Sequence, residues 1–234
     1  MRARAVVAAL ALVVLGVTGC GPDTSAAGSH GAQGGASSSG VPKSAGASGS
    51  ADSGTGVPSR PRLTSAQREQ VLLTLDDLPA GYRNDADPSA PQGRCMQRLS
   101  EVIVGDVHHQ FTQDSSGSFG AVVSSSSTTA PGKGHDRIAH AADLADQCAS
   151  FSMSEDGMPM TGRFVTHQAP RVLDESQMIV FTGSASGFTL NETFLVFRYG
   201  DNVAAVGVIP GDGSVAVDEA VRYARIVANR IRAA

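Results

Sequence analysis

Residues 21–61 cannot contribute to a hydrophobic core, and this limits what the 234-residue chain can fold into. Of these 41 residues, 31 are Gly, Ser, Ala or Pro, and only Val41 and Val57 are aliphatic and larger than Ala. Such a segment has too little apolar surface to offset the entropy lost on folding. It behaves as a flexible tether with a root-mean-square span of about 35 Å. A folded domain is expected only from about residue 63 onward, where roughly 170 residues are enough to bury a core.

The first twenty residues have the pattern of a bacterial lipoprotein signal peptide. Arg2 and Arg4 precede an apolar run of about 13 residues, which is shorter than the roughly 20 residues of a membrane-spanning helix. The run ends in VTGC, which resembles the lipobox at which lipoproteins are acylated, for example with palmitate, and cleaved before the Cys. We expect residues 1–19 to be the signal peptide and residues 20–62 to be a lipidated Cys20 followed by the tether. An ordinary secretory signal peptide is the alternative.

Lipidation of Cys20 predicts that the mature protein is held on the extracytoplasmic face of the cell membrane. The two acyl chains of a diacylglyceryl group anchor stably, because each buried CH₂ contributes roughly 0.8 kcal/mol. Only Lys43 and Lys133 are Lys among the 18 basic residues, and together with the many Ala, Gly, Val and Arg residues this indicates a GC-rich genome. The net charge of −4 and the pI near 5.8 disfavour nucleic acid as a partner.

From residue 63 to residue 234 the hydrophobic pattern predicts an α+β domain. Thr64 and Gln67 form a capping box ahead of a helix that ends near Leu78. Apolar residues at helical spacing predict further helices at 94–103, 135–151 and 214–232. Strand patterns occupy 120–128, 163–168, 177–183, 189–199 and 203–209, and a turn at 200–202 joins the last two. Hairpin-linked strands with helices before and after them predict a twisted antiparallel sheet of about 4–6 strands packed by helices.

Cys95 and Cys148 are the two thiols that remain if Cys20 is lipidated. The export signal places them in an oxidising compartment, so we expect one disulfide between them within the domain. Closing a loop of about 54 residues contributes roughly 4 kcal/mol in the chain-entropy treatment. Two buried free Cys are the alternative. A catalytic thiol is disfavoured, because neither Cys has a His beside it in sequence or a CxxC partner.

The order of these parts resembles a known family. The string LxxLPxGY at 75–82, a Cys on a short helix, a Gly- and Ser-rich strand, a helix ending in a second Cys, and a strand meander with FRYGD at 197–201 precede a closing helix. This order is similar to the extracellular sensor domain of mycobacterial receptor Ser/Thr kinases of the PknH type and to related actinobacterial lipoproteins. The resemblance covers about residues 63–234. It implies a twisted antiparallel sheet packed by helices, with a cleft for a ligand, although the kinases have a second disulfide that this chain cannot form.

The sequence contains none of the common catalytic or nucleotide-binding strings, and we predict no enzyme activity, no catalytic residue, no metal and no cofactor. The segment GSASG at 183–187 has Ala185 where a serine hydrolase has its nucleophile, so a turn between strands is expected. His108 and His109 would point to opposite sides of a strand, which leaves a zinc or copper site as the minor alternative. His135 and His140 are five residues apart, which does not place two ligands on one helical face.

Several charged or polar groups have a plainer interpretation. We expect solvated turn carboxylates at Asp76, Asp77, Asp85 and Asp87. The sequon at 191–193 is discounted as a glycosylation site, because it falls inside a predicted strand. The basic side chains of the last helix are expected to form a solvated face that also suits its negative C-terminal end, and these are Arg222, Arg225, Arg230 and Arg232.

The sequence therefore predicts a membrane-anchored extracytoplasmic lipoprotein with a non-catalytic sensor or ligand-binding domain. Its ligand is expected to be a small molecule, a lipid or a cell-wall fragment bound in a cleft between sheet and helices. No ligand-binding residue and no oligomeric state is predicted. A carrier of lipids or small hydrophobic molecules is an alternative that requires a large apolar cavity. A protein-interaction lipoprotein of the cell envelope is another, and it requires an exposed apolar patch.

Overall fold

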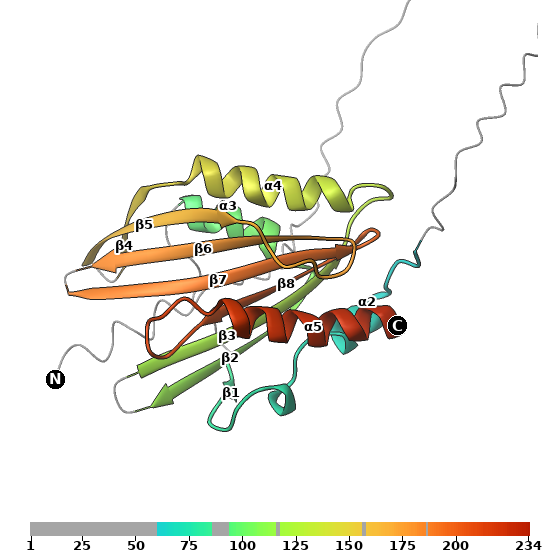
Figure 1. The fold of residues 1–234 in the computed structure, drawn as a ribbon, viewed down its shortest axis with the longest axis horizontal. Helices are drawn as coiled ribbons and strands as arrows, with labels where there is room; N and C mark the ends of the chain where they lie inside the picture. Colours follow the sequence, from blue (N-terminus) through green and yellow to red (C-terminus); the bar gives the residue numbers. More distant parts are fainter. Residues whose placement is uncertain (1–59, 86–93, 116–117, 156–157, 186) are drawn as a thin grey trace, which may run out of the picture. The chain divides into compact units, whose positions relative to one another are not determined.

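The computed structural model describes residues 60–85, 94–115, 118–155, 158–185 and 187–234 (Figure 1). In this part of the chain one antiparallel sheet of eight strands has the order β1-β2-β3-β8-β7-β6-β5-β4. The strands are β1 (Arg83–Asn84), β2 (Val107–Ser115), β3 (Ser118–Thr128), β4 (Phe151–Glu155), β5 (Met158–His167), β6 (Glu175–Ala185), β7 (Phe188–Tyr199) and β8 (Asn202–Ile209). The helices are α2 (Ser65–Gln70), the 3₁₀ turn η1 (Leu75–Asp77), α3 (Arg94–Ile103), α4 (Gly134–Gln147) and α5 (Val217–Ala233).

The predicted α+β class is confirmed, but the predicted count of four to six strands is too low, because the sheet has eight. The strands that the sequence pattern missed are β1, β2 and β4. β1 has only two residues, and β2 has the largely polar sequence VHHQFTQDS. These strands lie at or next to the edges of the sheet. An edge strand needs little apolar alternation, so its sequence carries a weak strand signal.

Helices cover both faces of the sheet (Figure 1). Apolar side chains alternate along β7, because successive residues of a strand point to opposite faces. Phe194 and Val196 belong to the core beneath α3 and α4, whereas Leu195 and Phe197 belong to the core beneath α5. The core residues of the described chain run from Leu63 to Ile231, so residues 59–234 contain the contacts of both cores and are expected to fold by themselves.

The first predicted helix is shorter than expected. The capping box at Thr64 and Gln67 is present, but α2 ends at Gln70 rather than near Leu78. Three consecutive residues that follow, 71–73, are all buried, which one helical stripe cannot achieve. The chain turns at residues 71–72, and the backbone N–H of Leu73 then donates to Ser124 Oγ at 3.0 Å on β3.

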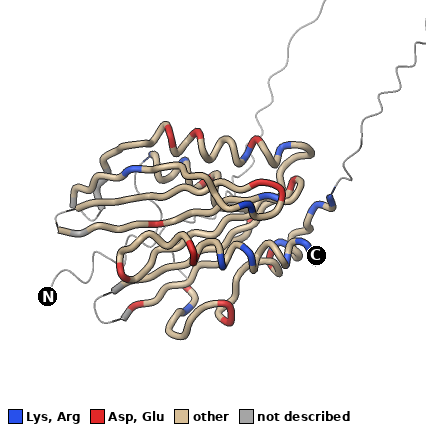
Figure 2. The backbone as a smooth tube through the Cα atoms, in the orientation of Figure 1, with Lys and Arg blue, Asp and Glu red and all other residues tan. Residues whose placement is uncertain are grey.

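The described chain begins with residues that are fixed to the β7–β8 turn. Arg60 pairs with Asp174 at 2.8 Å, and its guanidinium lies 3.8 Å from the ring centre of Tyr199. Asn202 Nδ2 donates to Pro61 O at 2.9 Å, and the N–H of Leu63 donates to Asn202 Oδ1 at 2.8 Å. Figure 2 shows basic residues gathered at this end of the domain, near the C-terminus. Cys20 and the predicted signal peptide lie outside the described residues.

Asp77 and Arg230 form an ion pair that joins η1 to α5. The Arg230 guanidinium donates to Asp77 Oδ1 at 2.9 Å and also to Leu72 O, and the N–H of Thr74 donates to Asp77 Oδ2 at 2.8 Å. The Asp77 side chain is only 13% exposed. The prediction of a solvated carboxylate is therefore wrong for Asp77, and the prediction of a solvated side chain is wrong for Arg230. The other three arginines of α5 are exposed, as predicted.

The substitution Asp77→Asn is expected to lower the free energy of unfolding by about 1–2 kcal/mol near neutral pH, because hydrogen bonds to charged groups are the stronger ones. Burial alone would raise the pKa of Asp77, but hydrogen bonds from Thr74 and Arg230 outweigh it and hold the pKa below its ordinary value. A lowered carboxyl pKa stabilises the fold above the unfolded pKa and ceases to do so as pH falls through the folded pKa. Urea unfolding at a series of pH values should show the difference shrinking below about pH 4. A difference that is constant with pH would contradict the ion pair.

Candidate functional site

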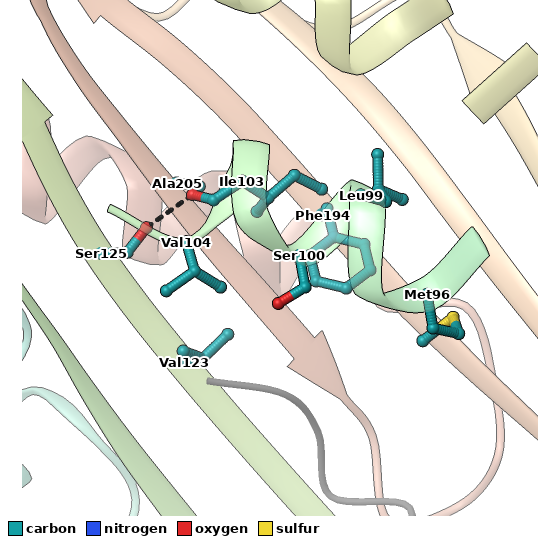
Figure 3. A pocket seen from close by; sticks show the side chains of 9 residues that line it. All are labelled: Met96, Leu99, Ser100, Ile103, Val104, Val123, Ser125, Phe194 and Ala205. Atoms are coloured by element: carbon teal, nitrogen blue, oxygen red, sulfur yellow. Dashed lines mark hydrogen bonds between the residues drawn. The ribbon is translucent and has the colours of Figure 1, made fainter. Parts of the chain in front are cut away.

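A narrow apolar cavity lies between α3 and the sheet (Figure 3). Its volume is about 20 Å³, which is room for about one water molecule. Both walls are mainly hydrophobic: one comes from the inner face of α3 and the other from β3, β7 and β8. The lining residues are Met96, Leu99, Ser100, Ile103, Val104, Val123, Ser125, Phe194 and Ala205.

Two polar contacts hold the C-terminal end of α3 over this cavity. The Ser125 hydroxyl on β3 donates to Ile103 O at 2.9 Å. Arg137 on α4 donates to Val102 O at 2.9 Å and to Val104 O at 3.2 Å. These bonds satisfy carbonyl groups that have no partner within the helix, because the last four C=O groups of any α-helix are left open.

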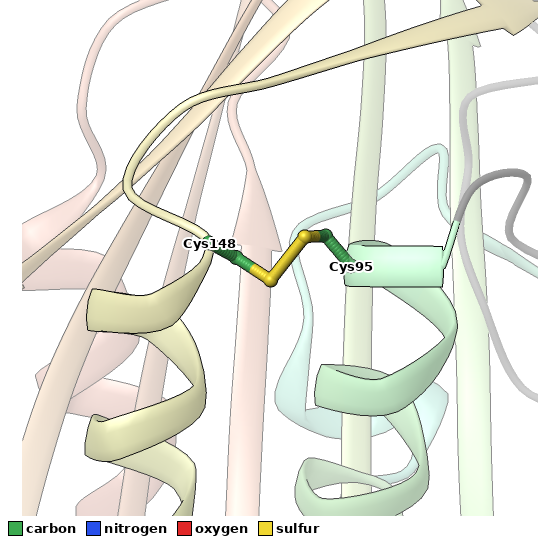
Figure 4. The surroundings of a disulfide bond; sticks show 2 residues. All are labelled: Cys95 and Cys148. Atoms are coloured by element: carbon green, nitrogen blue, oxygen red, sulfur yellow. A yellow bond between two sulfur atoms is a disulfide. The ribbon is translucent and has the colours of Figure 1, made fainter.

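The disulfide holds the other end of α3. Cys95, in its first turn, is bonded to Cys148 at the end of α4, with a Cα–Cα distance of 5.7 Å (Figure 4). The predicted disulfide is thus present in the structure. Since α4 packs on β5 to β8, the bridge fixes α3 to the helix that covers most of this face of the sheet.

Glu192 lies on the same face of the sheet as the cavity. It sits between Leu190 and Phe194 along β7, opposite Phe181 on β6, and all three neighbours belong to the core beneath α3 and α4. The Glu192 side chain is 1% exposed, and its Oε2 atom has no hydrogen-bond partner. Phe194, the next residue on this face of β7, lines the cavity, whereas Glu192 itself does not.

The surroundings of Glu192 favour its protonated form. Burial raises the pKa of the Glu192 carboxyl well above its ordinary value, and no neighbouring charge acts on it. An ionised carboxylate in apolar surroundings would carry a large desolvation cost with no cation to offset it. The site therefore combines an apolar wall with one neutral and unpartnered hydrogen-bonding group.

Glu192 is not among the candidate residues predicted from the sequence. Its position appears there only as the middle of the sequon at 191–193, and the predicted strand at that sequon is present. Asn191 is engaged there: its side chain accepts from Thr182 Oγ1 and donates to Gly213 O, both at 2.8 Å. The available signal was an acidic residue in the middle of a long apolar strand.

The predicted histidine arrangement is confirmed for β2, where His108 and His109 point to opposite faces. The ring nitrogens of His109 lie 2.8 Å from Leu73 O and 2.9 Å from Glu69 Oε1. Burial, reinforced by the neighbouring His109, lowers the pKa of His108. On α4, His135 lies 2.9 Å from Glu175. Among the residues that the structure describes, no three His, Cys, Asp or Glu side chains gather into a group that could hold a metal.

A wider polar hollow of about 540 Å³ opens beside β2 and η1. Its lining includes Asp76, Asn84 and Asp85, together with both histidines of β2. Its His109 ring is already bonded to the protein on both sides, and Asp85 accepts from Gln110 Nε2 at 3.3 Å. The hollow is open to solvent and lined mainly by polar residues, whereas the cavity under α3 is more enclosed and mainly apolar, so we take the cavity as the better candidate site for an apolar ligand.

The fold has a counterpart among solved structures, whereas no family profile and no curated protein matches the sequence. The crystal structure of the extracellular domain of PknH from Mycobacterium tuberculosis superposes with a TM-score of 0.52 and 11% identity, over 74% of this chain and 99% of that chain. A STAR-related lipid transfer protein from Xanthomonas axonopodis gives a TM-score of only 0.27 at 11% identity, over 65% of this chain and 97% of that chain. No helix in the described part of the chain has the length and apolar character needed to cross a bilayer. At 11% identity the likeness is one of fold, and the resemblance seen in the sequence is confirmed as a structural resemblance to the extracellular domain of PknH.

Proposed function

We propose that this chain is an extracytoplasmic lipoprotein, anchored through Cys20, whose folded domain binds a small apolar or amphiphilic ligand and performs no catalysis. The observation that carries the ligand-binding part is the Glu192 carboxyl, whose buried Oε2 atom has no partner, on the same face of β7 as Phe194, which lines the cavity under α3. Buried polar groups are nearly always hydrogen-bonded in folded proteins, so an exception beside a cavity points to a group supplied from outside.

The proposed location rests on two independent features. The first twenty residues have the charge, length and VTGC ending of a lipoprotein signal peptide. The disulfide between Cys95 and Cys148 suits an exported protein, because thiols are kept reduced in the cytoplasm. The likeness to an extracellular domain agrees with both.

The proposed ligand is apolar over most of its surface, because the cavity walls are. At about 20 Å³ the cavity is far smaller than the several hundred Å³ of a typical ligand site. A ligand therefore enters by moving α3 away from the sheet. The same volume gives no support to a lipid carrier, which requires a large cavity. The exposed large apolar residues Leu75, Val165 and Val215 lie in three different segments, which gives little support to a protein-interaction role.

Native mass spectrometry tests the ligand directly. A protease site introduced within residues 21–58 allows residues 59–234 to be released from the native cell envelope and compared with the same residues made in a foreign host. We expect a mass excess that is present only in the protein from the native envelope, and fragmentation of this species should give the class of the ligand. If the protein from both sources has the mass of the polypeptide alone, the proposed ligand-binding function is contradicted.

A further inference from the structure

Among the buried residues of the described chain, Glu192 is the only Asp, Glu, Lys or Arg. It makes no hydrogen bond or ion pair with the described residues around it, although a Leu or Met side chain of similar size would fill the same place without an unpartnered oxygen. Neither packing nor hydrogen bonding within the fold accounts for this carboxyl.

We propose that Glu192 is the polar anchor of the ligand site, and that it selects apolar ligands carrying a hydrogen-bond donor, an amine above all and a hydroxyl less strongly. This inference rests on the proposed function and specifies the ligand class. The cavity and the side chains around Glu192 would hold the apolar body, and the carboxyl would accept from the head group.

The preference for a donor follows from what the carboxyl offers. Its Oε2 atom is an unused acceptor, and its surroundings contain no cation and no charged partner. An ammonium head group would favour the ionised carboxylate, with the carboxyl proton released to solvent, and the unpartnered polar group would be replaced by a charge-assisted hydrogen bond. An anionic head group could accept only from the protonated carboxyl and would bring a charge into apolar surroundings that hold no cation to offset its desolvation, so the site should disfavour it.

The preference for an apolar body follows from the neighbours of Glu192. Leu190 and Phe194 flank it along β7, and Phe181 lies opposite. Phe181 continues into a stack of aromatic rings, with centroids 5.2 Å from Phe164 and 6.1 Å from Phe151. A ligand that separates α3 from the sheet would therefore meet aliphatic and aromatic surface at these three neighbours of the carboxyl.

Three ten-carbon probes that differ only in head group test whether Glu192 selects the ligand: decylamine, decanol and decanoate. Each is titrated by calorimetry into residues 59–234, below the concentration at which it forms micelles. Wild-type protein should bind decylamine about tenfold more tightly than decanoate, as expected for one hydrogen bond to a charged group. The isosteric variant Glu192→Gln should remove this preference. Glu192→Leu should remove it as well while still binding decanol.

The substitution Asp143→Asn is the matched control, because Asp143 is an exposed carboxylate on α4. It removes one negative charge, as Glu192→Gln does when Glu192 is ionised. It should leave the ratio of the affinities for decylamine and decanoate unchanged. Carboxyl carbon NMR adds a direct readout, since the Glu192 resonance should move on addition of decylamine and not on addition of decanoate.

The outcomes separate the two proposals. Equal binding of the three probes by wild-type protein, or an amine preference that survives in both Glu192 variants, would overturn the anchoring role and leave the proposed ligand-binding function standing. Absence of binding of every probe, together with a bare mass from the native envelope, would overturn both.

Discussion

Replacing both Cys95 and Cys148 by Ser is expected to lower the free energy of unfolding by about 4 kcal/mol. The bond links residues 53 positions apart, so its loss restores the entropy of a long loop to the unfolded chain. It also releases the N-terminal end of α3, while Ser125 and Arg137 still hold the C-terminal end. Urea unfolding followed by circular dichroism should show a midpoint shifted to lower urea. Because most small domains have a stability of about 5–15 kcal/mol, a loss of this size should leave the variant close to unfolding at 37 °C.

Reduction of the wild-type protein is the control for this prediction. A reducing agent should shift the wild-type unfolding curve onto that of the double-Ser variant and should leave the variant unchanged. Equal stability of oxidised and reduced wild-type protein would mean that the loop is already constrained in the unfolded chain, and it would contradict the predicted stabilisation.

The elements with strong periodic patterns could be predicted from the sequence. The helix at 94–103 is found with the predicted bounds, and β7 and β8 pair across the turn at Gly200, whose φ of 63° is in the left-handed region that a glycine adopts easily. These elements lie at the centre of the fold, where one whole face or stripe must be apolar. The edge strands β1 and β4, and β2 next to β1, were missed by the hydrophobic pattern, because pairing through the backbone places few demands on their side chains.

Of the contacts between residues far apart in the sequence, the disulfide could be predicted and the Asp77–Arg230 ion pair could not. The disulfide could be predicted because the expected export and the expected lipidation of Cys20, with a count of three Cys, leave one pairing. The Asp77–Arg230 pair joins residues 153 positions apart, and nothing in the local sequence of either residue specifies the other.

Glu192 illustrates why the site itself was harder to predict than the fold. Its significance depends on its burial and on the absence of a partner, which are properties of the packed sheet and not of the strand that carries it. Within β7 the residue interrupts a face that also carries Leu190 and Phe194, but one acidic residue in a strand does not by itself indicate a buried carboxyl. Only the assembly of β6, β7 and α3 turns an ordinary position in a strand into a candidate binding group.

The substitution Cys20→Ser is expected to remove the protein from the membrane fraction, because serine cannot take the thioether-linked diacylglyceryl group. The net charge of the chain is −4, which does not attract it to anionic lipid, and no helix in the described residues is long and apolar enough to cross the bilayer. Two buried acyl chains supply far more binding free energy than such a surface can, at roughly 0.8 kcal/mol for each CH₂. Cell fractionation with a carbonate wash measures the release of the variant from the membrane. The intact mass of the wild-type N-terminus shows whether Cys20 carries the acyl chains.

The control for this experiment is the folded state of the released protein, since a chain that misfolds could also leave the membrane. Cys20→Ser should retain the Cys95–Cys148 disulfide and the thermal unfolding midpoint of residues 59–234, because neither core contains residue 20. An ordinary secretory signal peptide gives a different pattern, in which wild-type protein and the variant are both released from the membrane. That pattern would overturn the lipid anchor, whereas a wild-type chain that stays with the membrane while the folded variant leaves it would establish Cys20 as the point of attachment.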